Sequence, residues 1–209
     1  MMRFLKAILV VAGLSISTIA LAANPADEFR LDKLPPATDE PINADVVTSP
    51  FAKGTKAVTT WISYTPPIRY SSDHVYHALA GIGYYLWNNH SVNVIFHGFS
   101  VDQLDDNTAQ GTGISFLGRY HFFNEDRWTC YFDGGVGYTW WNSAVPEGGT
   151  TYNFNPRVGL GVGYEIDRNV WLTSGARYFH ISNARAHGGE KNPGYDGIEC
   201  YIGLILTFN

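Results

Sequence analysis

The stretch Phe154-Asn155-Pro156-Arg157-Val158-Gly159-Leu160-Gly161-Val162-Gly163-Tyr164-Glu165-Ile166 decides the fold class of this chain. Its alternate residues, starting at Phe154, are aromatic, aliphatic or proline, and the residues between them are polar, charged or glycine. Because successive side chains of a strand point to opposite faces, this alternation predicts a strand with one apolar face and one polar face. A lipid-embedded barrel requires apolar residues outside and polar residues inside. A soluble sandwich also alternates, but its polar face is rarely so rich in glycine.

The same alternation recurs along the chain, for example where Ile114, Phe116, Tyr120 and Phe122 oppose Ser115, Arg119 and His121. We predict strands over 56–64, 74–86, 91–101, 112–123, 128–141, 153–166, 170–182 and 197–208. Tight connections at 87–90, 124–127 and 167–169 alternate with longer ones at 65–73, 102–111, 142–152 and 183–196. Short periplasmic turns and long extracellular loops are typical of outer-membrane barrels. The predicted fold is therefore all-β, an eight-stranded antiparallel outer-membrane β-barrel whose interior is filled by side chains and leaves no channel.

The N-terminal region divides into two segments before the barrel. Arg3 and Lys6 precede an apolar run that ends at Ala20-Leu-Ala22, which predicts a signal peptide over residues 1–22. Residues 23–54 contain Pro25, Pro35, Pro36, Pro41 and Pro50. Because proline removes backbone donors, we expect this Pro-rich periplasmic extension to be poorly ordered. The barrel is expected to occupy residues 55–209, with no helical membrane span.

The composition agrees with a membrane barrel and argues against nucleic acid as a partner. The chain has 13 Tyr, 12 Phe and 6 Trp but only 16% charged residues, as expected for a barrel with aromatic girdles. Two of its 14 basic residues lie in the signal peptide, against 19 acidic residues, so the mature chain is acidic. Cys130 and Cys200 fall on non-neighbouring predicted strands, too far apart for a disulfide.

Two polar residues continue the apolar row of the seventh predicted strand. Val170, Leu172, Ala176 and Tyr178 share one parity, and His180 and Ser182 follow on the same face, with Cα atoms about 7 Å apart. An imidazole at that place suits proton abstraction from a neighbouring hydroxyl. Polar groups on a lipid face cost free energy. They mark either the end of the strand in the headgroup zone or a hydrolase at the extracellular end, where lipopolysaccharide presents its acyl esters.

The residues that follow carry a family resemblance. His180-x-Ser182-Asn183-Ala184, Asn192-Pro193-Gly194 and Asp196-Gly197-Ile198-Glu199 resemble the PagL-type lipid A deacylases, which are outer-membrane 3-O-deacylases with an eight-stranded barrel. The specific match covers about 20 residues, and the rest of the chain agrees in architecture. The resemblance implies a serine esterase on the lipid-facing barrel wall that acts on lipid A of lipopolysaccharide in the outer leaflet, without a cofactor. It also implies a homodimer.

The resemblance further implies the role of each site residue. Ser182 is the expected nucleophile, His180 its general base, and Glu199 the acid that orients the imidazole. Groups around Asn183 and Ala184, together with Asn192 and Gly194, are expected to hold the oxyanion or position the substrate. The row Ile202, Leu204, Leu206 and Phe208 would point Glu199 inward unless a bulge near Cys200 resets the register. Asp196 and Glu190 therefore remain alternative acids.

The alternatives in function are a non-catalytic structural or adhesion barrel and a different lipid A enzyme such as an acyltransferase. The remaining histidines lack metal-ligand spacing, and no metal site is predicted. We expect His97 and His121 to join an interior polar network with Arg119, Arg177 and Asp133. Tyr138, Trp140 and Trp141 are expected to form an aromatic belt that could also flank an acyl groove.

Overall fold

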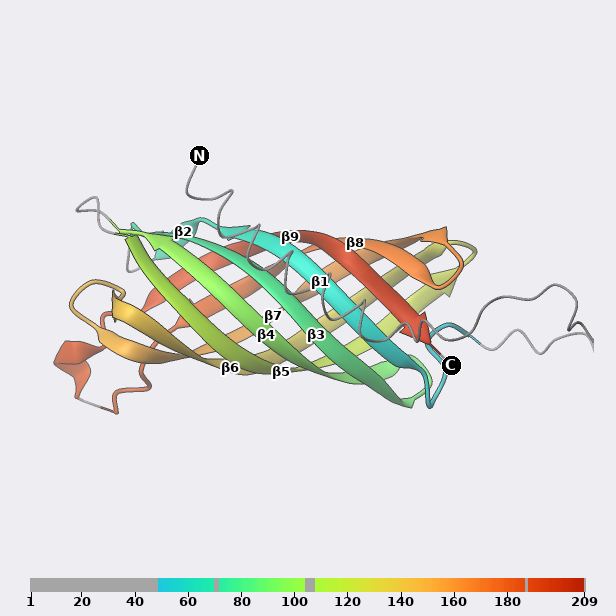
Figure 1. Cartoon of the computed structure of the whole chain (residues 1–209), viewed down its shortest axis with the longest axis horizontal. Helices are drawn as coiled ribbons and strands as arrows, with labels where there is room; N and C mark the ends of the chain where they lie inside the picture. The colour runs from blue at the N-terminus through green and yellow to red at the C-terminus, as the bar shows by residue number, and fades with distance from the viewer. Residues whose placement is uncertain (1–48, 70–71, 104–107, 187, 209) are drawn as a thin grey trace, which may run out of the picture.

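Eight long strands form one closed antiparallel barrel in the computed structural model, which describes residues 49–69, 72–103, 108–186 and 188–208 (Figure 1). The strands are β1 (Lys56–Thr65), β3 (His74–Trp87), β4 (His90–Asp102), β5 (Thr108–Glu125), β6 (Trp128–Val145), β7 (Thr150–Asp167), β8 (Val170–Ile181) and β9 (Tyr195–Phe208). Each pairs with its neighbour in the chain, and β1 pairs with β9 to close the barrel. A three-residue strand, β2 (Pro67–Arg69), pairs with β9 on the same edge as β1, beyond the end of β1.

The predicted barrel and its eight strands are confirmed, with most boundaries within two residues. The largest differences are at the loop ends of β5, β6 and β7, which run several residues beyond the predicted segments 112–123, 128–141 and 153–166. Hairpin pairing continues there past the apolar band, for example between Val145 and Thr150. No helix among the described residues has the length and apolar character needed to span a membrane.

The end of the barrel with short turns has a regular construction. The turns between β3 and β4, β5 and β6, and β7 and β8 contain Asn89, Asp126 and Asn169, each with positive φ. Asn and Asp adopt this left-handed conformation more readily than other residues with a Cβ. A register shift precedes each turn, as expected for a bulged hairpin. Short turns are found at the periplasmic end of outer-membrane barrels, so His180 and Ser182 lie toward the opposite, extracellular end.

The outer face is apolar and the interior is polar and aromatic. On β7, Phe154, Val158 and Leu160 are exposed on the outer face, whereas Asn155 and Arg157 are buried. Cys130 on β6 and Cys200 on β9 lie on non-neighbouring strands and are free, as predicted. Gly161 leaves space for two interior rings, because a Cβ there would lie 2.3 Å from the Tyr201 hydroxyl and 2.4 Å from the Tyr131 ring.

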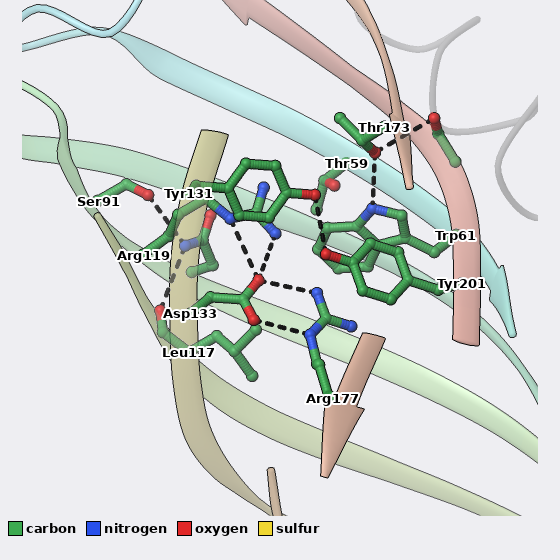
Figure 2. Close-up of polar contacts among 12 residues, drawn as sticks. Thr59, Trp61, Ser91, Leu117, Arg119, Tyr131, Asp133, Thr173, Arg177 and Tyr201 are labelled. Carbon is green, nitrogen blue, oxygen red and sulfur yellow. Dashed lines mark hydrogen bonds and ion pairs between the residues drawn. The ribbon is translucent and has the colours of Figure 1, made fainter. Parts of the chain in front are cut away.

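Asp133 is the centre of the interior polar network (Figure 2). Its carboxylate accepts hydrogen bonds from Arg119 Nη2 at 2.7 Å and from Arg177 Nε at 2.7 Å. The predicted Arg119–Asp133–Arg177 network is therefore present. His97 and His121 are inside the barrel as expected, but they hydrogen-bond to hydroxyl groups of neighbouring side chains: Ser115 for His97, and Tyr85 and Thr129 for His121.

Residues 49–54 pack against the periplasmic end, although they belong to the segment expected to be a poorly ordered extension. Phe51 is fully buried and stacks on His121, with ring centroids 3.9 Å apart. Gly54 N–H donates to the Tyr85 carbonyl at 2.9 Å, and Asn89 N–H donates to the Phe51 carbonyl at 2.7 Å. The predicted signal peptide over 1–22 and the rest of the predicted extension, residues 23–48, lie outside the described residues.

Candidate active site

His180 and Ser182 lie on the outer wall where β8 ends. Along this part of β8 the buried residues are Arg177, Phe179 and Ile181, whereas Tyr178 and His180 are not buried. Ser182 follows Ile181 and forms a bridge with Phe154: Phe154 N–H donates to the Ser182 carbonyl at 2.7 Å, and Ser182 N–H donates to the Phe154 carbonyl at 3.0 Å. This bridge keeps Ser182 in strand register, so it lies on the same face as His180.

Asp196 is the carboxylate next to His180. The two residues are directly opposite each other in the β8–β9 ladder, and His180 Nδ1 lies 2.6 Å from Asp196 Oδ1. A carboxylate accepts a hydrogen bond, so Nδ1 carries the proton and Nε2 keeps its lone pair. The imidazole is therefore held in the tautomer that a general base requires. The Tyr178 hydroxyl donates to the same Asp196 oxygen.

Glu199, favoured from the sequence as the orienting acid, is not brought to His180. It pairs with Arg177 in the ladder and is fully buried inside the barrel. Its carboxylate lies 3.5 Å from His77 Nε2, 3.6 Å from Arg157 Nη1 and 3.5 Å from Arg177 Nη1. The register between β8 and β9 is continuous, with no bulge at Cys200, so Glu199 is inward by strand alternation, three residues after the outward Asp196.

The loop from Asn183 to Gly194 is held by the first of its residues. Asn183 N–H donates to Asn192 Oδ1 at 2.9 Å, and the Asn183 side-chain amide donates to the Lys191 carbonyl at 2.7 Å. Asn183 Oδ1 accepts from Arg185 N–H at 2.9 Å. Asn183 is fully buried, so these bonds replace the water that its amide would otherwise bind. In this arrangement Asn183 and Asn192 fix the loop beside Ser182.

The remaining loop residues of interest differ in exposure and conformation. Ala184 is exposed and has φ 53°, which turns the chain directly after Asn183. Gly194 has φ 72° and leads the chain into β9 two residues before Asp196. Glu190, the other alternative acid, is exposed in the short 3-10 helix η2 (Gly189–Lys191). No ion pair or hydrogen bond joins Glu190 to His180 within the described ranges.

Aromatic residues cover the wall beside Ser182. Phe154, its bridge partner, is 40% exposed, and its ring centroid lies 5.3 Å from that of Tyr138. Trp140 lies 4.7 Å from Tyr138, centroid to centroid, and is exposed on the same face. Trp141 was expected in the same belt, but it is buried in the interior because it is the next residue along β6. The outer aromatic cluster therefore begins at Phe154, the strand position next to Ser182.

The arrangement is a Ser–His–Asp constellation on a wall that faces lipid. Adjacent outward residues on one strand have Cα atoms about 7 Å apart, within which two side chains can meet. No hydrogen bond joins the Ser182 hydroxyl to His180 in the part of the chain that the structure describes, and such bonds often tighten only with substrate bound. No group of three potential metal ligands occurs among the described residues. A nucleophile activated by an oriented base needs none.

Of the two residues beside His180, the sequence could place Tyr178 on its face but could not place Asp196. Tyr178 precedes His180 by two residues and so shares its face, and Asp196 lies opposite His180 once the β8–β9 register is known. The sequence shows the first relationship, but the length of the loop between the strands leaves the register open. Arg69 on β2, opposite Asp196 on its other side, was not predicted, because residues 65–73 read as a loop.

A closed eight-stranded barrel with an apolar outer wall defines an outer-membrane protein of Gram-negative bacteria, and the serine, histidine and aspartate on that wall define a candidate hydrolase. The family model described as "Lipid A 3-O-deacylase (PagL)" matches residues 57–204, so this chain belongs to the PagL family. A search of curated proteins found no match to this chain.

Solved structures agree with this fold. The outer-membrane enzyme PagL is 16% identical, with a TM-score of 0.55 over 69% of this chain and 97% of that chain. Neisserial surface protein A is also 16% identical, with a TM-score of 0.55 over 74% of this chain and 96% of that chain. The N-terminal barrel of Pseudomonas aeruginosa OprF is 14% identical, with a TM-score of 0.52 over 75% of this chain and 98% of that chain. At these identities the likeness shows the barrel alone.

Proposed function

We propose that this protein is an esterase that removes an ester-linked 3-hydroxyacyl chain from the 3-position of lipid A. The observation that carries the proposal is the His180–Asp196 pair, with Nδ1 2.6 Å from Oδ1, on the lipid-facing wall two residues before Ser182. A polar pair on the lipid face costs free energy, and a catalytic role would explain why it is there. Family membership supports lipid A as the substrate.

In the proposed mechanism Ser182 is the nucleophile. Its Oγ attacks the ester carbonyl carbon while its proton passes to His180 Nε2. Asp196 keeps the Nδ1 proton in place and stabilises the imidazolium that forms. The tetrahedral intermediate then expels the 3-hydroxyl oxygen of the sugar, which takes the proton from His180. The products of this half-reaction are an acyl-Ser182 ester and a lipid A with one chain fewer.

Water completes the reaction. It gives a proton to His180 Nε2 and attacks the acyl carbonyl, and the intermediate expels Ser182 Oγ, which takes that proton back. A free 3-hydroxy fatty acid leaves. We assign the backbone N–H of Ala184 as an oxyanion donor, because Ala184 is an exposed residue two positions after Ser182, whereas the Asn183 N–H is bonded to Asn192. Asn183, Asn192 and Gly194 position this turn. Substrate reaches the site laterally within the outer leaflet.

Asp196 takes the role that the sequence favoured for Glu199. Support comes from its direct hydrogen bond to the imidazole and from the inward direction of Glu199. Glu199 instead lies within ion-pair distance of the two buried guanidinium groups of Arg157 and Arg177.

Mass spectrometry of lipid A tests this function. Cells that express the wild-type protein should yield lipid A lighter by one hydroxyacyl unit, and cells with Ser182→Ala should not. Ser100→Ala, on β4 far from the site, serves as the matched control and should behave as wild type. Unchanged lipid A with the barrel folded in the membrane would favour a structural or adhesion barrel. A heavier lipid A would indicate an acyltransferase.

A further inference from the structure

We infer that Tyr178 is a positioning residue of the esterase site, which acts by fixing the Asp196 carboxylate. The inference rests on the proposed function and extends it to a fourth side chain. The Tyr178 hydroxyl donates to Asp196 Oδ1, the same oxygen that accepts the hydrogen bond from His180 Nδ1. One carboxylate oxygen thus receives two donors from a single strand.

The sheet geometry explains how Tyr178 reaches Asp196. Tyr178 is opposite Ile198 in the β8–β9 ladder, and Asp196 is its diagonal neighbour, two residues along. Diagonal neighbours on one face have Cα atoms about 7–8 Å apart, a gap that an aromatic side chain spans. A tyrosine has the length for this contact, and its ring remains on the apolar wall while its hydroxyl reaches the acid. Phenylalanine has the same ring without the donor.

The second hydrogen bond has two chemical consequences. It restricts rotation of the Asp196 carboxylate, so the imidazole is oriented before the substrate arrives. It also spreads the negative charge of Oδ1 over two donors, which weakens the attraction of the carboxylate for a protonated imidazole. Loss of the hydroxyl should therefore lower the rate and move the acid limb of the pH–rate profile to higher pH.

Other charged groups around the pair lie on two elements. Arg69 of β2 is opposite Asp196 on the side away from His180. The loop after Ser182 contributes the exposed residues Arg185, Glu190 and Lys191. On β7, the neighbour on the remaining side of β8, the outward residues near the site are Phe154 and Pro156, which carry no charge. The change Tyr178→Phe leaves all these charges in place, so a shift in the pH profile reports the lost hydroxyl.

The test compares wild type, Tyr178→Phe and Tyr120→Phe in purified, folded protein. Tyr120 is 43% exposed on the outer wall of β5 and is the matched control. Two rates are measured against pH: labelling of Ser182 by a fluorophosphonate, and hydrolysis of lipopolysaccharide. In the labelling reaction Ser182 Oγ bonds to phosphorus, fluoride leaves, and the serine proton passes to His180. The first rate reports activation of Ser182 without lipid A.

For Tyr178→Phe we expect both rates to fall about tenfold at the optimum, with the acid limb of each profile displaced to higher pH. Tyr120→Phe should superimpose on wild type. Profiles of Tyr178→Phe that coincide with wild type would overturn the inference and leave the esterase intact. If the wild-type protein is labelled at Ser182 but does not hydrolyse lipopolysaccharide, the proposed substrate alone is overturned. The labelling profiles of wild type and Tyr178→Phe then still test the role of Tyr178. A wild type that neither labels nor hydrolyses would overturn both.

Discussion

His180 and Asp196 are directly opposite each other on β8 and β9, with Nδ1 2.6 Å from Oδ1. The pair is on the outer wall, and 27% of the His180 side chain is exposed, so the imidazole is accessible from the lipid side. Within the β8–β9 ladder, a carboxylate of β9 can reach this imidazole only if its side chain points to the outer face, as that of His180 does. Asp196 meets that condition and Glu199 does not.

Asp196→Asn should therefore abolish most of the activity. The amide presents either an N–H or a carbonyl oxygen to Nδ1 and cannot stabilise the imidazolium. Loss of the acid in a Ser–His–Asp triad lowers kcat by about 10⁴-fold. Hydrolysis of purified lipopolysaccharide by the detergent-refolded variant measures this. Retention of more than a tenth of the wild-type kcat would show that Asp196 does not orient the base.

Glu199→Gln should show the opposite behaviour, with activity largely retained and stability lost. The Glu199 carboxylate is fully buried among Arg157, Arg177 and His77, so its removal leaves buried positive charge uncompensated. Breaking a buried ion pair on one side costs about 3–5 kcal/mol. Urea-induced unfolding in detergent, monitored by tryptophan fluorescence, should show a lower midpoint. A stable but inactive Glu199→Gln variant would instead support the triad with Glu199.

Asn183→Ala should loosen the loop beside Ser182. The substitution removes the side-chain hydrogen bonds to the Lys191 carbonyl and from the Arg185 N–H, and it leaves the bond between Asn183 N–H and Asn192. Hydrogen exchange at Arg185 should become faster, and kcat/KM should fall about 10- to 100-fold as the turn at Ala184 loses its geometry. Asn142→Ala, in the exposed hairpin end of β6, should change neither. Unaltered exchange at Arg185 would contradict the assigned role.

How much of this structure can be predicted from the sequence depends on two things: the alternation of faces along each strand, and the register between neighbouring strands. Alternation along 154–166 is enough to predict which residues face lipid, and the tight Asn and Asp turns set the pairing at the periplasmic end. Parity also places His180 and Ser182 together. The choice between Asp196 and Glu199 needs the β8–β9 register, which the long loop 183–194 leaves undetermined in the sequence. Similarly, the proline-rich sequence of 23–54 gives no indication that Phe51 packs on His121, because this contact joins residues that are 70 positions apart.

Phe154 is expected to contact the acyl chain of the substrate. It is the bridge partner of Ser182, and its exposed ring continues into Tyr138 and Trp140 on the same wall. Removing this ring loses its packing against the acyl chain, roughly 1–2 kcal/mol of binding for about ten atom contacts of about 0.1–0.2 kcal/mol each. Phe154→Ala should thus raise KM roughly tenfold or more, with little change in kcat. Phe132→Ala, at a 46% exposed position on β6 near the turns, removes the same ring from lipid contact and should leave KM unchanged. Equal effects of the two variants would mean that the acyl chain does not lie along β6 and β7. A fall in kcat alone would mean that Phe154 supports Ser182 and does not contact the substrate.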